Sequence, residues 1–107
     1  MSFDVVVIGG GPAGLASAVA LARSGASVLV CEKSAEPGLK PCGEGLLPRA
    51  FQELCSLGLR SRELLLEGKL LHGVDYVAAS GRRASAQFRE GPGLGLPRTA
   101  LARLLHA

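Results

Sequence analysis

A glycine-rich run near the start of the chain has the spacing of a phosphate-binding turn. Residues 9–14 read Gly-Gly-Gly-Pro-Ala-Gly and fit the pattern Gly-x-Gly-x-x-Gly. Gly9 allows a sharp turn, Gly11 leaves room for a diphosphate beside the backbone, and Gly14 allows the following helix to pack closely. Unpaired amides and a partial positive charge at a helix start, here at Pro12 and Ala13, favour an anion. The run therefore predicts a site for the phosphates of a dinucleotide.

A carboxylate follows at the distance where the ribose of such a ligand would lie. Glu32 comes 18 residues after Gly14 and ends a short apolar run. A carboxylate in this place accepts hydrogen bonds from ribose hydroxyls and disfavours a 2′-phosphate. A glycine-rich turn alone is weak evidence, because such turns also join strands to helices without any ligand. With the acid in place, dinucleotide binding is the favoured interpretation, but FAD and NAD share the ADP half and are not separated by spacing.

Three elements must position this turn. Val5–Ile8 is a continuous β-branched run, which predicts a parallel strand covered on both faces. Ala13–Ser24 is rich in Ala and Leu and predicts a helix closed by Gly25, and Ser27–Cys31 predicts a second strand. A right-handed crossover makes the two strands parallel. The expected fold class is α/β, a Rossmann-like βαβ unit of an FAD- or NAD(P)-binding domain.

The rest of the chain predicts smaller elements. Residues 36–45 are rich in Pro, Gly and Lys and indicate an ordered loop. A helix is expected from about Pro48 to Gly58, with Leu47, Phe51, Leu54 and Cys55 on one face, whereas residues 59–72 are ambiguous. The remaining expected elements are two strands of a small inserted hairpin and a last helix: Val74–Ala79, Ala84–Phe88, and a helix from Pro97 with Leu101, Leu104 and Leu105 on one face.

Length and composition bound the function. The 107 residues allow one small domain, and 48% apolar residues favour a folded core. The 12 basic residues are scattered against 9 acidic ones, so nucleic-acid binding is disfavoured. Cys31, Cys42 and Cys55 show neither metal-ligand nor disulfide spacing, which predicts no metal site and a reducing cytoplasm. The apolar stretch Leu15–Ala22 is too short for a membrane span and is expected to be a buried helix.

The opening of the chain resembles a known group of flavoproteins. The segment Asp4–Gly14, followed by Glu32 and Lys33, is similar to the start of FAD-dependent oxidoreductases of the flavin-monooxygenase and geranylgeranyl-reductase superfamily. The Gly-Gly-Gly-Pro-Ala-Gly form is typical of flavoproteins. The resemblance implies that FAD is the cofactor and that Lys33 belongs to its site together with the turn and Glu32.

Two further segments carry the same resemblance. The stretch Cys42, Gly43, Glu44 and Gly45 resembles the Cys-Gly-Glu-Gly segment of the geranylgeranyl reductase-like branch, where it borders the flavin. Arg98 stands before Thr-Ala-Leu as in the Arg-x-x-Leu helix start of the superfamily, where the arginine contacts FAD. Plainer interpretations stay open: Cys42 as a turn residue, Glu44 as a solvent-facing acid, and Arg98 as a helix-start residue that needs an anion nearby.

The resemblance also implies that more of the flavin site is needed. Such enzymes contact the diphosphate and isoalloxazine again late in the sequence, and no segment of that type occurs among these 107 residues. We therefore expect residues 1–107 to be the amino-terminal part of an incomplete FAD-binding domain, with no second domain. The flavin of the parent enzyme would be reduced by NAD(P)H or another donor. Catalytic residues are not identified, since His72 and His106 are expected to be surface or core residues. The alternatives are a fragment of an NAD-binding dehydrogenase and a non-catalytic nucleotide-binding remnant.

Overall fold

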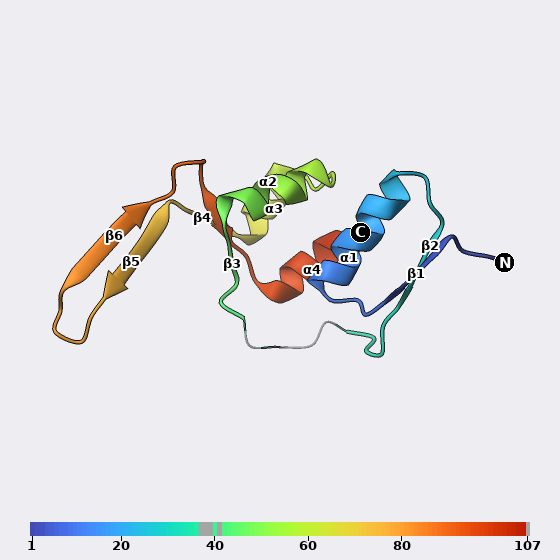
Figure 1. The fold of residues 1–107 in the computed structure, drawn as a ribbon, viewed down its shortest axis with the longest axis horizontal. Coiled ribbons are helices and arrows are strands. Elements are labelled where there is room, and N and C mark those ends of the chain that lie inside the picture. Colours follow the sequence, from blue (N-terminus) through green and yellow to red (C-terminus); the bar gives the residue numbers. More distant parts are fainter. Residues whose placement is uncertain (37–39, 41, 107) are drawn as a thin grey trace.

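The computed structural model describes residues 1–36, 40 and 42–106. The molecule is elongated, 61 × 26 × 21 Å, because one hairpin projects from a body of helices and short strands (Figure 1). The parallel strands β1 and β2 lie at the opposite end of the body from the hairpin (Figure 1).

The opening unit is the predicted strand, helix and strand. β1 (Val5–Ile8) pairs in parallel with β2 (Val28–Cys31), and α1 (Pro12–Arg23) connects them. The start of the pairing is fixed by Asp4, whose carboxylate accepts hydrogen bonds from the amide and the hydroxyl of Ser27, both at 2.8 Å. These two bonds, the one from the backbone amide foremost, hold the pKa of Asp4 below its ordinary value. The predicted α/β class and parallel pairing are confirmed.

One face of this two-stranded sheet is uncovered in the described chain. Val6 and Ile8 are 54% and 89% exposed, whereas Val7 lies against Gly14 of α1 and is half-buried. The expectation of a strand covered on both faces is therefore wrong for the described residues. The reason is that α1 packs on one side of the pair and leaves the alternate side chains of β1 outside.

Two helices and a three-stranded antiparallel sheet form the middle of the body. α2 (Pro48–Ser56) lies where a helix was predicted, and α3 (Ser61–Glu67) follows it. The strands are β3 (Gly45–Leu46), β4 (Lys69–Leu71) and β7 (Gly93–Gly95), in the order β3-β7-β4. β3 begins at the last residue of the predicted loop. Strands this short show no readable alternation of apolar and polar residues, so periodicity did not predict β3 or β7.

The predicted apolar face of α2 is only partly correct. Leu54 is buried and Phe51 packs against the core, as expected. Leu47 is 64% exposed and Cys55 is exposed as well. Leu47 is the residue that precedes the helix, so its side chain does not follow the helical spacing that the sequence pattern assumed.

The last helix supplies much of the core. α4 (Arg98–His106) packs along α1 (Figure 1), and its predicted stripe is confirmed because Leu101 and Leu105 are buried and Leu104 is half-buried. α1 is itself buried along one face only, at Leu15 and Ala18. No helix in the described part of the chain has both the length and the apolar character needed to cross a bilayer. The core cluster is Leu15, Leu54, Leu64, Leu94, Leu96, Ala100, Leu101, Ala102 and Leu105.

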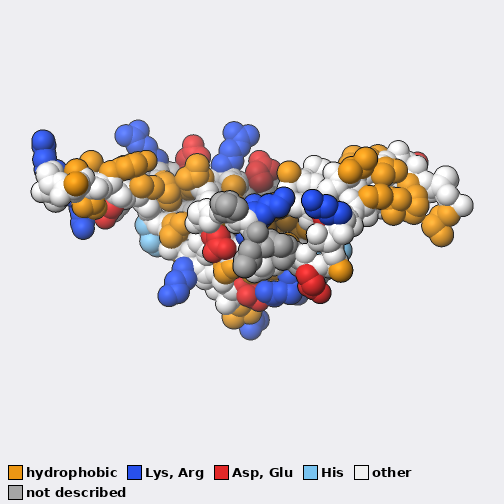
Figure 2. Space-filling view, turned by 90° about the horizontal axis from the view of Figure 1, so that it is seen from below, with side chains coloured by type: hydrophobic (Ala, Val, Ile, Leu, Met, Phe, Trp, Pro, Cys, Tyr) orange, Lys and Arg blue, Asp and Glu red, His pale blue; other side chains and the backbone are white. Residues whose placement is uncertain are grey.

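The projecting hairpin agrees with its sequence pattern. β5 (Gly73–Val77) pairs antiparallel with β6 (Arg83–Gln87), and all residues of both strands are exposed. Figure 2 shows apolar side chains over this hairpin at one end of the molecule and over the β1–β2 end at the other. Arg83 begins β6, and its Nη1 atom lies 3.7 Å from the carboxylate of Asp75. The turn before it contains Gly81 with a φ of 85°.

Candidate functional site

The turn between β1 and α1 has the backbone that its glycines predict. Gly9 has a φ of 104°, a region that side-chain-bearing residues rarely adopt, and its amide donates to the carbonyl of Cys31 at 2.8 Å. A Cβ atom at Gly14 would collide with the carbonyl oxygen of Gly9, so close contact between helix and turn requires glycine there. A Cβ atom at Gly11 would meet only the Nη2 atom of Arg98, at 3.9 Å. The space predicted in front of Gly11 is therefore present.

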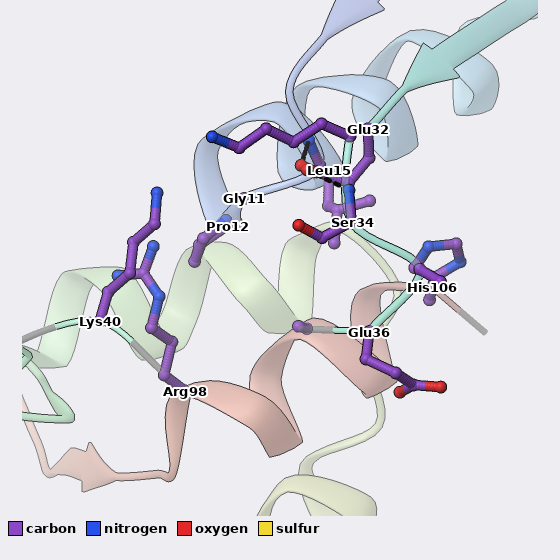
Figure 3. A pocket seen from close by; sticks show the side chains of 13 residues that line it. Gly11, Pro12, Leu15, Glu32, Ser34, Glu36, Lys40, Arg98 and His106 are labelled. Atoms are coloured by element: carbon purple, nitrogen blue, oxygen red, sulfur yellow. Dashed lines mark hydrogen bonds between the residues drawn. The ribbon is translucent and has the colours of Figure 1, made fainter. Parts of the chain in front are cut away.

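Glu32 points at this turn. One carboxylate oxygen accepts a hydrogen bond from the Gly10 amide at 2.6 Å, and the other accepts from the Ser34 amide at 3.0 Å (Figure 3). The Gly10 bond first, then the Ser34 bond, lowers the pKa of Glu32. The side chain is therefore held as an anion at the carboxyl end of β2, where ligands of parallel sheets bind.

A pocket of about 140 Å³ lies beside the turn. Five of the residues that the sequence assigned to the cofactor line it, namely Gly11, Pro12, Glu32, Lys33 and Arg98. Arg98 reaches it from the start of α4, on the opposite side from the turn (Figure 3). The other assigned residues of the turn, Gly9, Ala13 and Gly14, do not line the pocket, but they shape the backbone around it.

The Cys-Gly-Glu-Gly segment does not line this pocket. Cys42 and Gly43 are exposed, and Gly45 starts β3 opposite Gly95. Glu44 has a φ of 56°, and its carboxylate accepts a hydrogen bond from the backbone amide of Arg98 at 3.2 Å. The expected contact of these residues with the flavin stays a prediction.

Several pocket residues were not among those predicted. Ala102 and His106 follow Arg98 at intervals of four residues, so all three lie on one face of α4. That spacing was the signal available in the sequence. His106 is exposed at the pocket rather than in the core. The other lining residues that the sequence did not assign are Gly10, Leu15, Ser34, Ala35, Glu36 and Lys40.

The described residues form no cluster of side chains that could bind a metal ion. Across residues 1–36, 40 and 42–106, no three His, Cys, Asp or Glu side chains come together in a way that could hold an ion. The three cysteines are free and exposed. The charged groups at the pocket are instead two carboxylates, Glu32 and Glu36, and three cations, Lys33, Lys40 and Arg98. This mixture suits an anionic ligand that also offers hydroxyl donors.

The hydrogen bonds of Glu32 predict a pH-dependent stability. Because folding lowers its pKa, the carboxylate stabilises the fold at pH values above its unfolded pKa, and this contribution is lost as the pH falls through the folded pKa. Glu32→Gln should therefore unfold at a lower temperature than the wild type near neutral pH. The difference should shrink on acidification, as followed by circular dichroism between pH 7 and 3. Glu90→Gln, at an exposed position, is the control, and a difference for Glu32→Gln that does not change with pH would contradict the prediction.

Comparison with known proteins agrees with this geometry. Residues 2–106 match the family described as FAD binding domain. Menaquinone reductase of Mycobacterium tuberculosis is 48% identical over 84 residues, which are 78% of this chain and 18% of that protein. Digeranylgeranylglycerophospholipid reductase 1 of Methanopyrus kandleri is 41% identical over 75 residues, 69% of this chain and 19% of that protein. The chain thus spans less than a fifth of the length of these curated relatives.

A solved structure shows the same fold. The anhydrotetracycline hydroxylase from Streptomyces rimosus superposes with a TM-score of 0.79 at 32% identity, over 99% of this chain and 22% of that one. These matches confirm the resemblance to flavoprotein oxidoreductases and favour FAD over the NAD-binding alternative. Since the family match covers residues 2–106, the chain belongs to the FAD binding domain family, and its cofactor is FAD.

Proposed function

We propose that the pocket between the β1–α1 turn and α4 binds the ADP half of FAD. The observation that supports this most strongly is the ionised Glu32, held by the Gly10 amide next to the open space at Gly11. A diphosphate needs that space and the amides at the helix start, and a ribose needs the acceptor.

Several groups in and around the pocket then have a role toward the nucleotide. The amides of Ala13 and Gly14 belong to the first turn of α1 and have no partner within the helix, and Pro12 has no N–H to lose. They would donate to the diphosphate, while the Arg98 guanidinium offsets its charge from the opposite side. Lys33 adds positive charge to the pocket, and so does Lys40, which is labelled in Figure 3. Cys42 to Gly45 are proposed to lie toward the flavin half.

We further propose that residues 1–107 are the amino-terminal part of an FAD-binding domain within a reductase. The match to menaquinone reductase, 48% identical over 84 residues, supports a reductase, because it is longer and higher in identity than the matches to rifampicin monooxygenase (44% over 62 residues) and squalene epoxidase (41% over 78 residues). When bound, FAD supplies the hydride chemistry, with NAD(P)H or another donor as the source of electrons. The residues described here bind and orient the nucleotide and exclude a 2′-phosphate through the charge of Glu32. None of them is assigned a bond-making role.

Calorimetric titration of the 107-residue chain tests the proposal. We expect one equivalent of FAD to bind, and ADP to compete for the same site because both contain the adenosine and the diphosphate. FMN lacks the adenosine and is expected not to bind, and NADP⁺ is expected to bind more weakly than NAD⁺ because of Glu32. Binding of FMN without binding of ADP would place the flavin elsewhere and contradict the proposal.

A further inference from the structure

Glu44 has an unusual backbone for its residue type. Its φ of 56° makes it the one non-glycine residue with a positive φ in the described chain. Side-chain-bearing residues adopt this region rarely, and they persist there when their surroundings impose it. Glu44 stands in the segment that was expected to touch the flavin, yet it does not line the nucleotide pocket.

The contacts of Glu44 lead instead to the start of α4. Its carbonyl oxygen accepts a hydrogen bond from the Leu96 amide at 2.8 Å, and its Oε1 atom accepts one from the Arg98 amide at 3.2 Å. The next residue, Gly45, pairs with Gly95 in the β3–β7 ladder. Backbone and side chain of Glu44 therefore hold both sides of Pro97, at the point where β7 ends and α4 begins.

The contact with Glu44 also offsets the unfavourable position of the Arg98 charge. Arg98 is the first residue of α4, where the helix dipole is positive and a cation is unfavourable. The Glu44 carboxylate supplies a negative charge at the same helix start. The Arg98 guanidinium meanwhile reaches the pocket and lies beside Gly11. Its position there depends on the position of its backbone, which Glu44 holds.

We propose that Glu44 is a positioning residue for Arg98, which it fixes against the diphosphate end of the pocket without touching the cofactor. This inference rests on the proposed function of the pocket. The positioning role and a direct flavin contact make different predictions. If Glu44 only positions Arg98, replacing Glu44 should have no effect on FAD binding once the Arg98 side chain is removed.

A double-mutant cycle on FAD affinity tests the dependence. Glu44→Gly removes the carboxylate and suits the positive φ, and it should weaken FAD binding about tenfold, as the loss of one hydrogen bond to a charged group would. Glu44→Gln keeps an acceptor oxygen and should recover most of the affinity. In an Arg98→Ala background, Glu44→Gly should cause no further loss. Glu90→Gln serves as the control for removing an exposed negative charge.

Two results overturn the inference. Equal FAD affinity of Glu44→Gly and the wild type shows that the contact is unimportant for binding. Additive losses of Glu44→Gly and Arg98→Ala show that Glu44 acts on the cofactor independently of Arg98.

A second measurement needs no nucleotide. Hydrogen exchange of the Arg98 amide, followed by NMR, should be about tenfold faster in Glu44→Gly than in the wild type, and close to the wild-type rate in Glu44→Gln. A wild-type chain that binds no FAD contradicts the proposed function. Even then, an equal exchange rate in the wild type and in Glu44→Gly overturns the positioning role.

Discussion

Gly14→Ala is expected to destabilise the fold by about 2 kcal/mol, although alanine is the better helix former. The new Cβ atom would collide with the carbonyl oxygen of Gly9 and would lie 3.4 Å from Cγ1 of Val7. Overpacking of this kind costs about 1–3 kcal/mol, and a clash with rigid backbone belongs at or above the upper end of that range. The gain in helix propensity is only about 1 kcal/mol. The clash therefore outweighs the gain.

Urea unfolding of the wild type and the variant measures this difference. Gly43→Ala is the matched control, because a Cβ atom at Gly43 meets no heavy atom within 4 Å and its unfolding free energy should change by no more than about 0.5 kcal/mol. Gly14→Ala should also lose FAD affinity, since the turn must shift to admit the methyl group. A Gly14→Ala midpoint equal to that of the wild type would show that α1 does not pack this closely on the turn.

The opening unit was readable from the sequence because its signals are local. The β-branched composition of Val5–Ile8 predicts a strand, and the glycine spacing of residues 9–14 predicts a tight turn. The structure agrees, because a Cβ atom at Gly14 would collide with the backbone of the turn. Glu32 was correctly expected at the end of the second strand, and its carboxylate lies at the turn. Its hydrogen bond to the Gly10 amide was not foreseen, because spacing locates a carboxylate but does not show which donors reach it.

The strands that could not be predicted from the sequence form by pairing with residues far away along the chain. β3 and β7 consist of two and three residues, and they exist because Leu46 meets Leu94 across 48 residues. The exposure of Ile8 was not predicted, because the continuous run Val5–Ile8 indicates two covered faces, whereas in the described residues α1 covers only one of them. Local pattern identifies an element, whereas its coverage depends on the rest of the fold.

The candidate site shows the same division. The turn and Glu32 come from the first 32 residues and were assigned from spacing, but the opposite wall of the pocket is a face of α4. Arg98 was assigned by resemblance alone, and Ala102 and His106 were not assigned at all. They reach the pocket because the leucine stripe of α4 packs on the core beside α1, which turns the face with Arg98 toward the turn.

Gly11→Ala is expected to separate binding from folding, which Gly14→Ala cannot do. The backbone of Gly11, with φ −73° and ψ 178°, suits any residue, and the nearest atom to a new Cβ is Nη2 of Arg98 at 3.9 Å. At this helix N-cap, alanine is worse than glycine by up to about 1 kcal/mol, but the stiffer unfolded chain returns about 0.4–1 kcal/mol. The urea midpoint should therefore stay near that of the wild type.

The methyl group would stand where the diphosphate approaches the backbone, so FAD affinity measured by calorimetry should fall about 10- to 100-fold through lost charge-assisted hydrogen bonds. Unchanged affinity would mean that the phosphates lie away from this turn, and the assignment of the ADP half to this pocket would then be wrong even though the chain belongs to an FAD-binding family.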